Sequence, residues 1–276
     1  MTLLPLVTEG DLIQDRALSA SGGKALFIKE LEQAIEAGEA DVAVHSMKDV
    51  PAALPPGFAI GAVLERGDPC DAFVSNDHVA LEALPNVARL GTSSLRRQCQ
   101  LLRLRPDLAI VMLRGNVETR LRKLDERQVD ATILAAAGLE RLGLAARMRE
   151  RLSPHRMMPA VGQGVIGVEC QEGDARVGGL LVALEHPGTR RRLDAERAFA
   201  GRLGGSCQSP IAGHAELDGG SLLLTGFVGA PDGSSAFEDR IEGPAGDGAA
   251  LGRQLAERLL AAGAEALLRS LGADPR

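Results

Sequence analysis

The chain has 276 residues, of which 45% are hydrophobic and 25% are charged, a composition typical of globular proteins. Its net charge of −6 argues against a general nucleic-acid binder, which would carry a basic surface. Trp and Tyr are absent and Phe occurs six times, so the sequence lacks aromatic platforms for stacking bases or sugars. No run approaches the roughly 18 apolar residues of a membrane span and no signal peptide opens the chain, which predicts a cytoplasmic protein without a membrane partner.

Strand and helix patterns alternate through the first part of the sequence. An apolar strand candidate at residues 3–7 is followed by helical spacing at residues 25–38 and by strands at residues 41–46 and 58–64. The alternation predicts an α/β layer with parallel strand pairing. Between residues 71 and 143 the pattern recurs, which favours two halves of like topology, although any two βαβ units share it.

The final third of the sequence has a different pattern. After one more apolar strand at residues 161–170, residues 190–205 have helical spacing. Short strands separated by Asp-Gly turns fill residues 214–243, and this pattern is typical of antiparallel hairpins. A closing helix at residues 248–272 completes a predicted small α+β domain.

The stretch DVAVHSMKDVP, residues 41–51, places polar side chains directly after a predicted strand. Ligands of open α/β sheets bind in the crevice outside the carboxyl ends of the strands. Lys48 and Asp49 would face such a crevice, and we interpret them as functional. A solvated surface turn ended by Pro51 would explain the same residues, so this alternative stays open.

A second cluster combines positive charge with the start of a helix. In GTSSLRRQ, residues 91–98, Ser94 precedes a predicted helix whose first turn carries Arg96 and Arg97. Free N–H groups, hydroxyls and guanidiniums together favour an anion site. Because cations at a helix N-terminus oppose the helix dipole, we expect a negative group to compensate them.

Three more arginines are expected at the same edge: Arg114, Arg120 and Arg141. Each alone is more often a solvated surface residue. Five arginines at one edge indicate a ligand with several carboxylates or phosphates, bound by bidentate forks. A nucleotide is disfavoured because the sequence has no P-loop spacing.

Four cysteines are widely spaced and form no C-x-x-C pair, so no metal site is predicted. Cys207 lies in a Gly-rich loop, LGGSCQSP, where a thiol is accessible enough to act as a nucleophile. Cys170 ends an apolar strand and is interpreted as packing. A loop cysteine is often incidental, and a cysteine-dependent hydrolase is a distant alternative.

Six motifs, in order and spacing, resemble those of the porphobilinogen deaminase (hydroxymethylbilane synthase) family: HSMKDVP, GTSSLRRQ, LRGNVETRL, AAAGLERLG, AVGQG and GGSCQSPIAGHA. The resemblance implies an α/β fold of two type II periplasmic-binding-protein-like lobes plus a small α+β domain. The implied domains are residues 1–68 with 164–185, residues 69–163, and residues 186–276, the last of which carries the cofactor cysteine.

The resemblance also implies an activity. Members of the family are transferases that polymerise four porphobilinogen molecules into the linear tetrapyrrole hydroxymethylbilane with release of ammonia, primed by a covalent dipyrromethane cofactor. Cys207 matches the cysteine that holds the dipyrromethane through a thioether, and Asp49 matches the catalytic carboxylate, with Lys48 beside it. A monomer with no metal is expected.

The remaining matches concern the acetate and propionate groups of each pyrrole. The positions that match cofactor-binding residues are Lys48, Ser94, Arg96, Arg97 and Arg114. The positions that match substrate-binding residues are Lys24, Arg114, Arg120 and Arg141.

The sequence departs from the family pattern at two places. Members begin with a strand and helix containing R-x-S-x-L-A-x-x-Q, whereas this chain opens at the following strand, and Cys70 stands where an Arg is usual. From the missing strand we expect a chain impaired relative to a longer form, and an inactive deaminase is one alternative. A two-lobed small-anion binding protein without catalysis is another, and it would need neither Asp49 nor Cys207.

Overall fold

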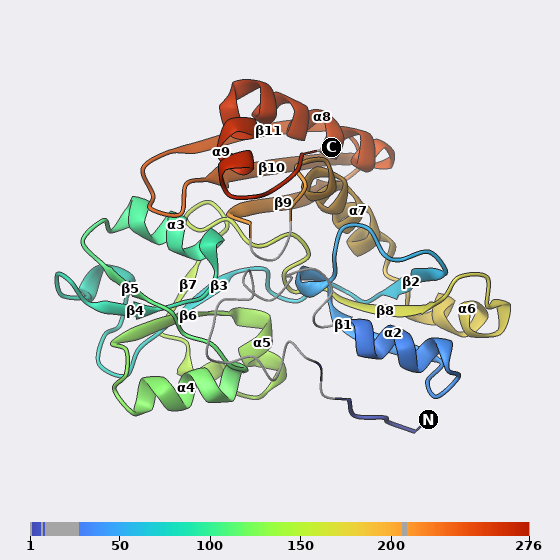
Figure 1. Cartoon of the computed structure of the whole chain (residues 1–276), viewed down its shortest axis with the longest axis horizontal. Coiled ribbons are helices and arrows are strands. Elements are labelled where there is room, and N and C mark those ends of the chain that lie inside the picture. The colour runs from blue at the N-terminus through green and yellow to red at the C-terminus, as the bar shows by residue number, and fades with distance from the viewer. Residues whose placement is uncertain (1, 7, 9–27, 206–208, 276) are drawn as a thin grey trace.

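The computed structural model describes residues 2–6, 8, 28–205 and 209–275. Within these ranges the chain forms three sheets, each with its own helices, which we call the first, second and third sheets (Figure 1). Figure 1 shows the first and second sheets side by side, with the third above them. None of the helices in these ranges is long and apolar enough to cross a membrane.

The first sheet contains β1 (Val42–Ser46), β2 (Phe58–Val63) and β8 (Ile166–Gln171). β8 lies between the other two strands and pairs antiparallel with each of them. The parallel pairing expected for this part of the chain is therefore wrong in the described residues, because a strand from much later in the sequence separates the two early ones. Residues 2–6 form no strand, so the strand expected at residues 3–7 is also wrong in its described part.

Two helices cover the first sheet, α2 (Lys29–Glu36) and α6 (Ala175–Leu181). Ile35 of α2 is buried against Phe58, so the predicted apolar stripe of this helix does face the sheet. Leu181 of α6 belongs to a separate buried cluster, which also contains residues of the sheet. The two helices give the first sheet small cores of its own.

The second sheet has the strand order β5-β4-β6-β3-β7. Its strands are β3 (Asp71–Val74), β4 (Arg89–Gly91), β5 (Ala109–Val111), β6 (Ala131–Ala135) and β7 (Glu150–Leu152). β4 pairs parallel with β5 and β6, whereas β3 pairs antiparallel with β6 and β7. The predicted parallel pairing is thus confirmed for the β5-β4-β6 part of this sheet.

Three helices connect the strands of the second sheet: α3 (Leu95–Leu104), α4 (Val117–Asp125) and α5 (Ala136–Arg141). Leu101 of α3 lies in one buried cluster and Leu121 of α4 lies in another. Both clusters include strand residues, because successive side chains of a strand point to opposite faces. The helices therefore cover two faces of the sheet, as the α/β pattern predicts.

The third sheet is antiparallel, in the order β11-β10-β9, as the Asp-Gly turns predict. Its elements are β9 (Ile211–Asp218), β10 (Ser221–Gly229), β11 (Ala236–Pro244), α7 (Pro187–Arg202), α8 (Gly248–Leu259) and α9 (Glu265–Ser270). Phe199 of α7 and Leu255 of α8 are fully buried in the core between helices and sheet. The predicted α+β organisation of this region is confirmed.

Two segments carry the chain between the first and second sheets, and they are hydrogen-bonded to each other. Gly67 N donates to Gly164 O at 3.0 Å, and Leu64 N donates to Ile166 O at 3.0 Å. Gly164 has a φ of +85°, and a Cβ at this position would lie 2.7 Å from the Gly67 carbonyl oxygen. Glycine is therefore required where the two segments cross.

A buried ion pair joins this crossing to the third sheet. Arg66 Nη1 lies 2.6 Å from Glu196 Oε1, and both side chains are almost fully buried. Glu196 of α7 also accepts hydrogen bonds from Gly162 N at 2.8 Å and Ala215 N at 2.9 Å. A buried carboxylate with this many donors is well satisfied, so it fixes α7 against the crossing.

Acidic side chains and a histidine lie together beside α2, and they make part of the stability depend on pH. His45 Nε2 lies 2.7 Å from Glu169 Oε2, and both side chains are buried. Burial raises the pKa of Glu32 to about 7, with Glu169 and Glu36 adding to the rise and His45 opposing it. Because the folded-state pKa lies above the usual 4.5, the unfolded chain loses this proton first, and stability should fall as pH rises from 4.5 through 7.

The Glu32→Gln variant cannot titrate at this position, so its thermal unfolding midpoint should fall less than that of the parent chain between pH 5 and pH 8. The difference should be on the order of 2 kcal/mol, or roughly 5 °C. Glu39→Gln, an exposed substitution just beyond the same helix, is the matched control. Identical pH dependence in all three proteins would contradict this role of Glu32.

Candidate active site

The turn after β1 presents two polar side chains between two buried anchors. Met47 and Val50 are 1% and 7% exposed and pack in one apolar cluster. Between them, in the 3₁₀ turn Met47–Asp49, Lys48 is partly buried and Asp49 is exposed. Gly162, with a φ of +71°, lies so close that a Cβ there would be 3.0 Å from the Met47 backbone. The anchors therefore fix where Asp49 leaves the first sheet.

The start of α3 is capped by Ser94, the serine that directly precedes the predicted helix. Ser94 Oγ accepts a hydrogen bond from the N–H of Arg97 at 3.4 Å, and Thr92 Oγ1 accepts one from the N–H of Ser94 at 3.2 Å. The side chains of Arg96 and Arg97 point into the protein, where the two residues are 4% and 5% exposed. Guanidiniums buried this deeply require a negative partner.

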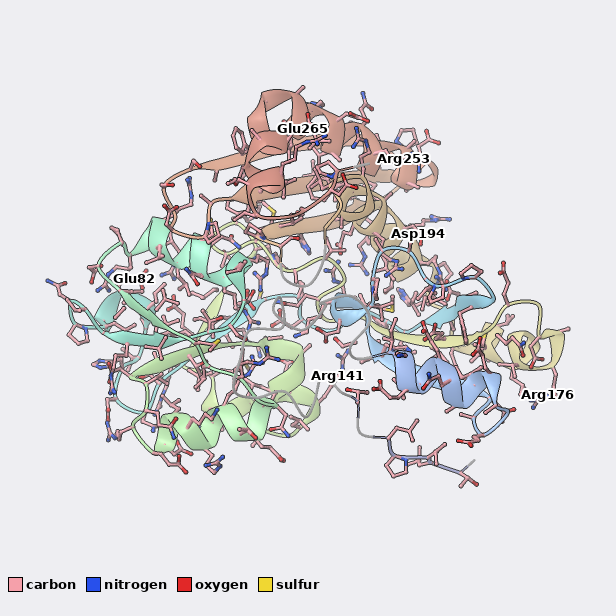
Figure 2. The ribbon with its side chains drawn as sticks, viewed as in Figure 1. Glu82, Arg141, Arg176, Asp194, Arg253 and Glu265 are labelled. Atoms are coloured by element: carbon pink, nitrogen blue, oxygen red, sulfur yellow. The ribbon has the colours of Figure 1, made fainter. Side chains whose placement is uncertain are left out.

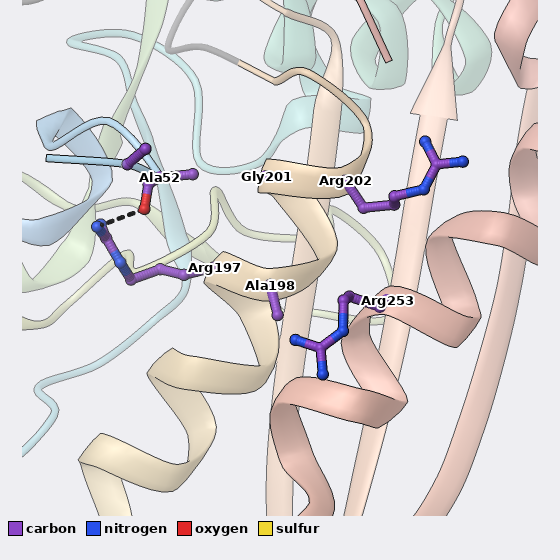
Figure 3. A pocket seen from close by; sticks show the side chains of 7 residues that line it. Ala52, Arg197, Ala198, Gly201, Arg202 and Arg253 are labelled. Carbon is purple, nitrogen blue, oxygen red and sulfur yellow. Dashed lines mark hydrogen bonds between the residues drawn. The ribbon is translucent and has the colours of Figure 1, made fainter. Parts of the chain in front are cut away.

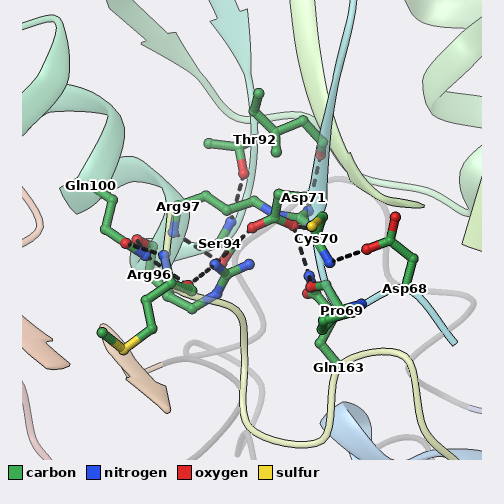
Figure 4. A network of polar contacts seen from close by, with 12 residues as sticks. Asp68, Pro69, Cys70, Asp71, Thr92, Ser94, Arg96, Arg97, Gln100 and Gln163 are labelled. Carbon is green, nitrogen blue, oxygen red and sulfur yellow. Dashed lines mark hydrogen bonds and ion pairs between the residues drawn. The ribbon is translucent and has the colours of Figure 1, made fainter. Parts of the chain in front are cut away.

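Asp71 is that negative partner (Figure 4). Its Oδ2 lies 2.8 Å from Arg96 Nη1, its Oδ1 lies 2.7 Å from Arg97 Nη2, and Gln163 Nε2 donates to Oδ1 at 3.1 Å. Burial alone would raise the pKa of Asp71, but the two guanidiniums outweigh it and hold the pKa well below its usual range. The negative group expected to compensate the two arginines is thus a residue of the chain itself, Asp71, which sequence reasoning did not single out.

Both arginines also donate to backbone carbonyls. Arg97 Nη1 donates to Ile133 O at 3.0 Å, and Arg96 Nη1 donates to Met158 O at 2.6 Å. These bonds and the contacts to Asp71 orient each guanidinium through several atoms at once. The positive edge of the second sheet is therefore held in place by the protein's own groups.

Further cations from the second sheet lie near the turn that carries Asp49. Arg114 follows β5 and is 9% exposed, and Arg120 Nε donates to Gly115 O at 2.7 Å. Burial lowers the pKa of Arg120 to about 10, with Arg97 and Arg114 adding to the fall and Asp49 opposing it. These charges come from elements of two different sheets and still act on one another, so they belong to one site.

Lys48 belongs to the same group of charges. Burial lowers the pKa of Lys48, with Arg97 and Arg120 adding to the fall and Asp49 opposing it. The group contains five cations and two carboxylates among the described residues: Lys48, Arg96, Arg97, Arg114, Arg120, Asp49 and Asp71. An excess of positive charge in a partly buried site fits a ligand that carries several carboxylates.

The other predicted site residues do not enter this group of described charges. Arg141, labelled in Figure 2, is exposed at the end of α5, and its Nη2 donates to Gly164 O at 2.7 Å. It is thus held at the crossing between the first and second sheets. Lys24 and Cys207 lie outside the described residues.

Two of the remaining cysteines are packing residues with unreactive thiols. Cys170 is 5% exposed in the first sheet, as expected. Cys70 is partly buried, and burial raises the pKa of its thiol to about 12, with Asp68 adding to the rise. Because the thiolate is the nucleophilic form, neither position suits covalent chemistry.

Two family models match the chain. One, described as "Porphobilinogen deaminase, dipyromethane cofactor binding domain", matches residues 1–178, and the other, "Porphobilinogen deaminase, C-terminal domain", matches residues 191–261. The predicted α/β fold, with two α/β sheets and a small α+β domain, is confirmed. A solved periplasmic substrate-binding protein of an ABC transporter from Coxiella burnetii is 17% identical, with a TM-score of 0.40 over 57% of this chain and 76% of that chain.

Two curated relatives, both named porphobilinogen deaminase, match almost the whole chain. The protein from Thiobacillus denitrificans is 53% identical over 273 residues, which cover 99% of this chain and 89% of the relative. The protein from Chromobacterium violaceum is 53% identical over 274 residues with the same two coverages. This chain therefore belongs to the porphobilinogen deaminase family.

Proposed function

We propose that this chain is a transferase that joins four porphobilinogen molecules head to tail into hydroxymethylbilane and releases ammonia. The excess of lysine and arginine charge around the exposed Asp49 is the observation that carries the proposal. Each porphobilinogen unit brings an acetate and a propionate, so a growing chain of them is a polycarboxylate. The names of the curated relatives support the same reaction.

Asp49 is the proposed catalytic residue. Its carboxylate leaves a turn fixed by Met47 and Val50, which gives it a defined position at the site. A fixed carboxylate can accept a hydrogen bond from a pyrrole N–H and stabilise the positive charge that develops when ammonia leaves. Lys48, beside it, supplies an ammonium group for a ligand carboxylate.

The arginines are proposed to hold the carboxylates of substrate and cofactor. Lys48, Ser94, Arg96, Arg97 and Arg114 are assigned to the cofactor, and Lys24, Arg114, Arg120 and Arg141 are assigned to the substrate. Arg96 and Arg97 together carry one more positive charge than Asp71 neutralises, and this remaining charge supports the assignment.

The cofactor is proposed to be a dipyrromethane joined to Cys207 by a thioether. When bound, it supplies the pyrrole to which the first substrate unit is added. Cys207 lies in the segment between α7 and β9, and the positive charge around Lys48 and Arg97 fits the acetates and propionates of such a group. The name of the matching family model supports the same cofactor.

The proposal includes the division of the chain into domains and its state of association. Residues 1–68 with 164–185 would form one lobe around the first sheet, residues 69–163 the second lobe, and residues 186–276 the α+β domain. The bounds are supported because the described strands of each sheet all fall within one of these three domains. A monomer is proposed on the resemblance to the porphobilinogen deaminase family.

Intact-mass measurement of the purified protein tests the proposal most directly. The parent chain should exceed its sequence mass by two pyrrole units, and Cys207→Ser should show its sequence mass alone and no turnover of porphobilinogen. Cys170→Ala removes a buried thiol and should keep the added mass. Added mass on Cys207→Ser would contradict the attachment site, and a parent chain without added mass would favour a binding protein that performs no chemistry.

A further inference from the structure

Arg197 of α7 donates three hydrogen bonds to consecutive backbone carbonyls. Its Nη2 donates to Pro51 O at 2.7 Å and to Ala52 O at 3.0 Å, and its Nη1 donates to Val50 O at 3.4 Å. Figure 3 shows the guanidinium reaching from α7 to Ala52. These carbonyls directly follow Asp49 in the chain, so one side chain holds the backbone on which the proposed catalytic carboxylate stands.

The helix and the turn are also packed closely beside this contact. A Cβ at Gly201, one turn beyond Arg197 on α7, would lie 3.3 Å from Ala52 Cβ. A shallow hollow of about 310 Å³ adjoins the contact (Figure 3). The hydrogen bonds of the Arg197 guanidinium and the close approach of Gly201 to Ala52 therefore set the distance between α7 and residues 50–52 at two separate places.

The guanidinium of Arg197 is placed at an energetic cost. Burial lowers the pKa of Arg197, while Asp194 opposes the fall, Arg190 adds to it and Glu169 opposes it more weakly. A cation removed from water needs compensating hydrogen bonds, and the three carbonyls supply them. A surface arginine that served only solubility would not be held in this way.

We propose that Arg197 is a positioning residue of the reaction, which acts through the backbone of residues 50–52 on the location of the Asp49 carboxylate. The inference rests on the proposed function, in which Asp49 is catalytic. Because α7 ends at Arg202, shortly before Cys207, the same helix connects the segment that carries the proposed cofactor to the turn that carries Asp49. An arginine suits the role because its planar fork reaches several acceptors at once, whereas a lysine offers one point charge.

Steady-state kinetics of the holoenzyme test the inference. Arg197→Met keeps much of the side-chain volume and removes all donors, and it should lower kcat about 10²-fold, since displacement of a catalytic group by about 1 Å costs this much. KM should stay within about 3-fold, because the arginines that hold the substrate are unchanged, and Arg197→Lys should fall between the parent chain and Arg197→Met.

Arg202→Met is the matched control. Arg202 lies on the same helix, and its guanidinium pairs with Glu257 of α8 instead of the turn. This variant should keep the parent kcat. The thermal midpoint and the added cofactor mass are measured for every variant, so that unfolding or loss of cofactor is separated from displacement of the Asp49 carboxylate. If Arg197→Met does not fold, Arg197→Lys is compared with the parent chain instead. Equal losses in kcat for Arg197→Met and Arg202→Met would overturn the inference.

A double-mutant cycle separates action through Asp49 from a general structural effect. In an Asp49→Glu background, where the carboxylate is already displaced, Arg197→Met should lower kcat by less than about 3-fold further. An equal fold-loss in kcat from Arg197→Met in both backgrounds would overturn the role of Arg197 but leave the proposed role of Asp49 intact. Parent-like turnover in Asp49→Asn would instead overturn the proposed role of Asp49, and the link from Arg197 with it.

Discussion

Asp49→Asn is expected to lower kcat about 10²- to 10⁴-fold, which is the range that a positioned acid–base or charge-stabilising group contributes. The amide keeps the shape of the side chain but cannot carry the negative charge that stabilises the developing cation. The turn should be preserved, because Met47 and Val50 anchor it from both sides. Measurement of porphobilinogen turnover at saturating substrate gives kcat directly.

Asp41→Asn is the matched control for Asp49→Asn. Asp41 precedes the same strand at its opposite end, where its exposed carboxylate pairs with exposed Arg176. The control should keep full turnover, and both variants should keep the thermal midpoint of the parent chain. Comparable turnover in the two variants would count against Asp49 as the catalytic group.

Asp71→Asn is expected to have the largest effect on stability, because it leaves Arg96 and Arg97 buried without a full negative charge. Removing one partner of a buried ion pair typically costs about 3–5 kcal/mol. For a chain of this size the loss corresponds to a fall of roughly 10 °C in the thermal unfolding midpoint. Turnover should also fall, since Asp71 holds both guanidiniums in place.

A matched substitution at a more exposed ion pair of the second sheet separates the effect of burial on stability from the effect of pairing. Asp130 pairs with Arg89 at 2.8 Å, but the two side chains are 33% and 47% exposed. Asp130→Asn should therefore cost only about 0–1 kcal/mol, as exposed pairs do. If Asp71→Asn lowered the midpoint no more than Asp130→Asn, the two arginines would not depend on Asp71.

The sequence predicts much of the candidate site because its signals are local. The strand that ends before Lys48 and Asp49, the capping Ser94 and the arginines of α3 are each encoded within a few residues. The helix dipole argument also predicts a compensating anion. It could not identify Asp71, because the contact joins the start of β3 to α3 across residues that share no pattern.

The features that sequence reasoning missed are contacts between distant parts of the chain. The sequence alone does not distinguish Arg66, Glu196 and Arg197 from solvated surface charges. Only the packing of α7 against residues 50–66 removes them from solvent and gives them partners. The antiparallel first sheet was missed for the same reason. An apolar run predicts that β8 is a strand, but it does not say which strands become its neighbours.

The central position of β8 in the first sheet has a consequence for biosynthesis. The described strands of the second sheet all lie between residues 71 and 152, so all of them leave the ribosome before β8 does. β1 and β2 are made first, but they have no described partner until residues 166–171 emerge. The lobe that begins the chain is therefore the later of the two to close, and until then its apolar strands depend on protection from aggregation.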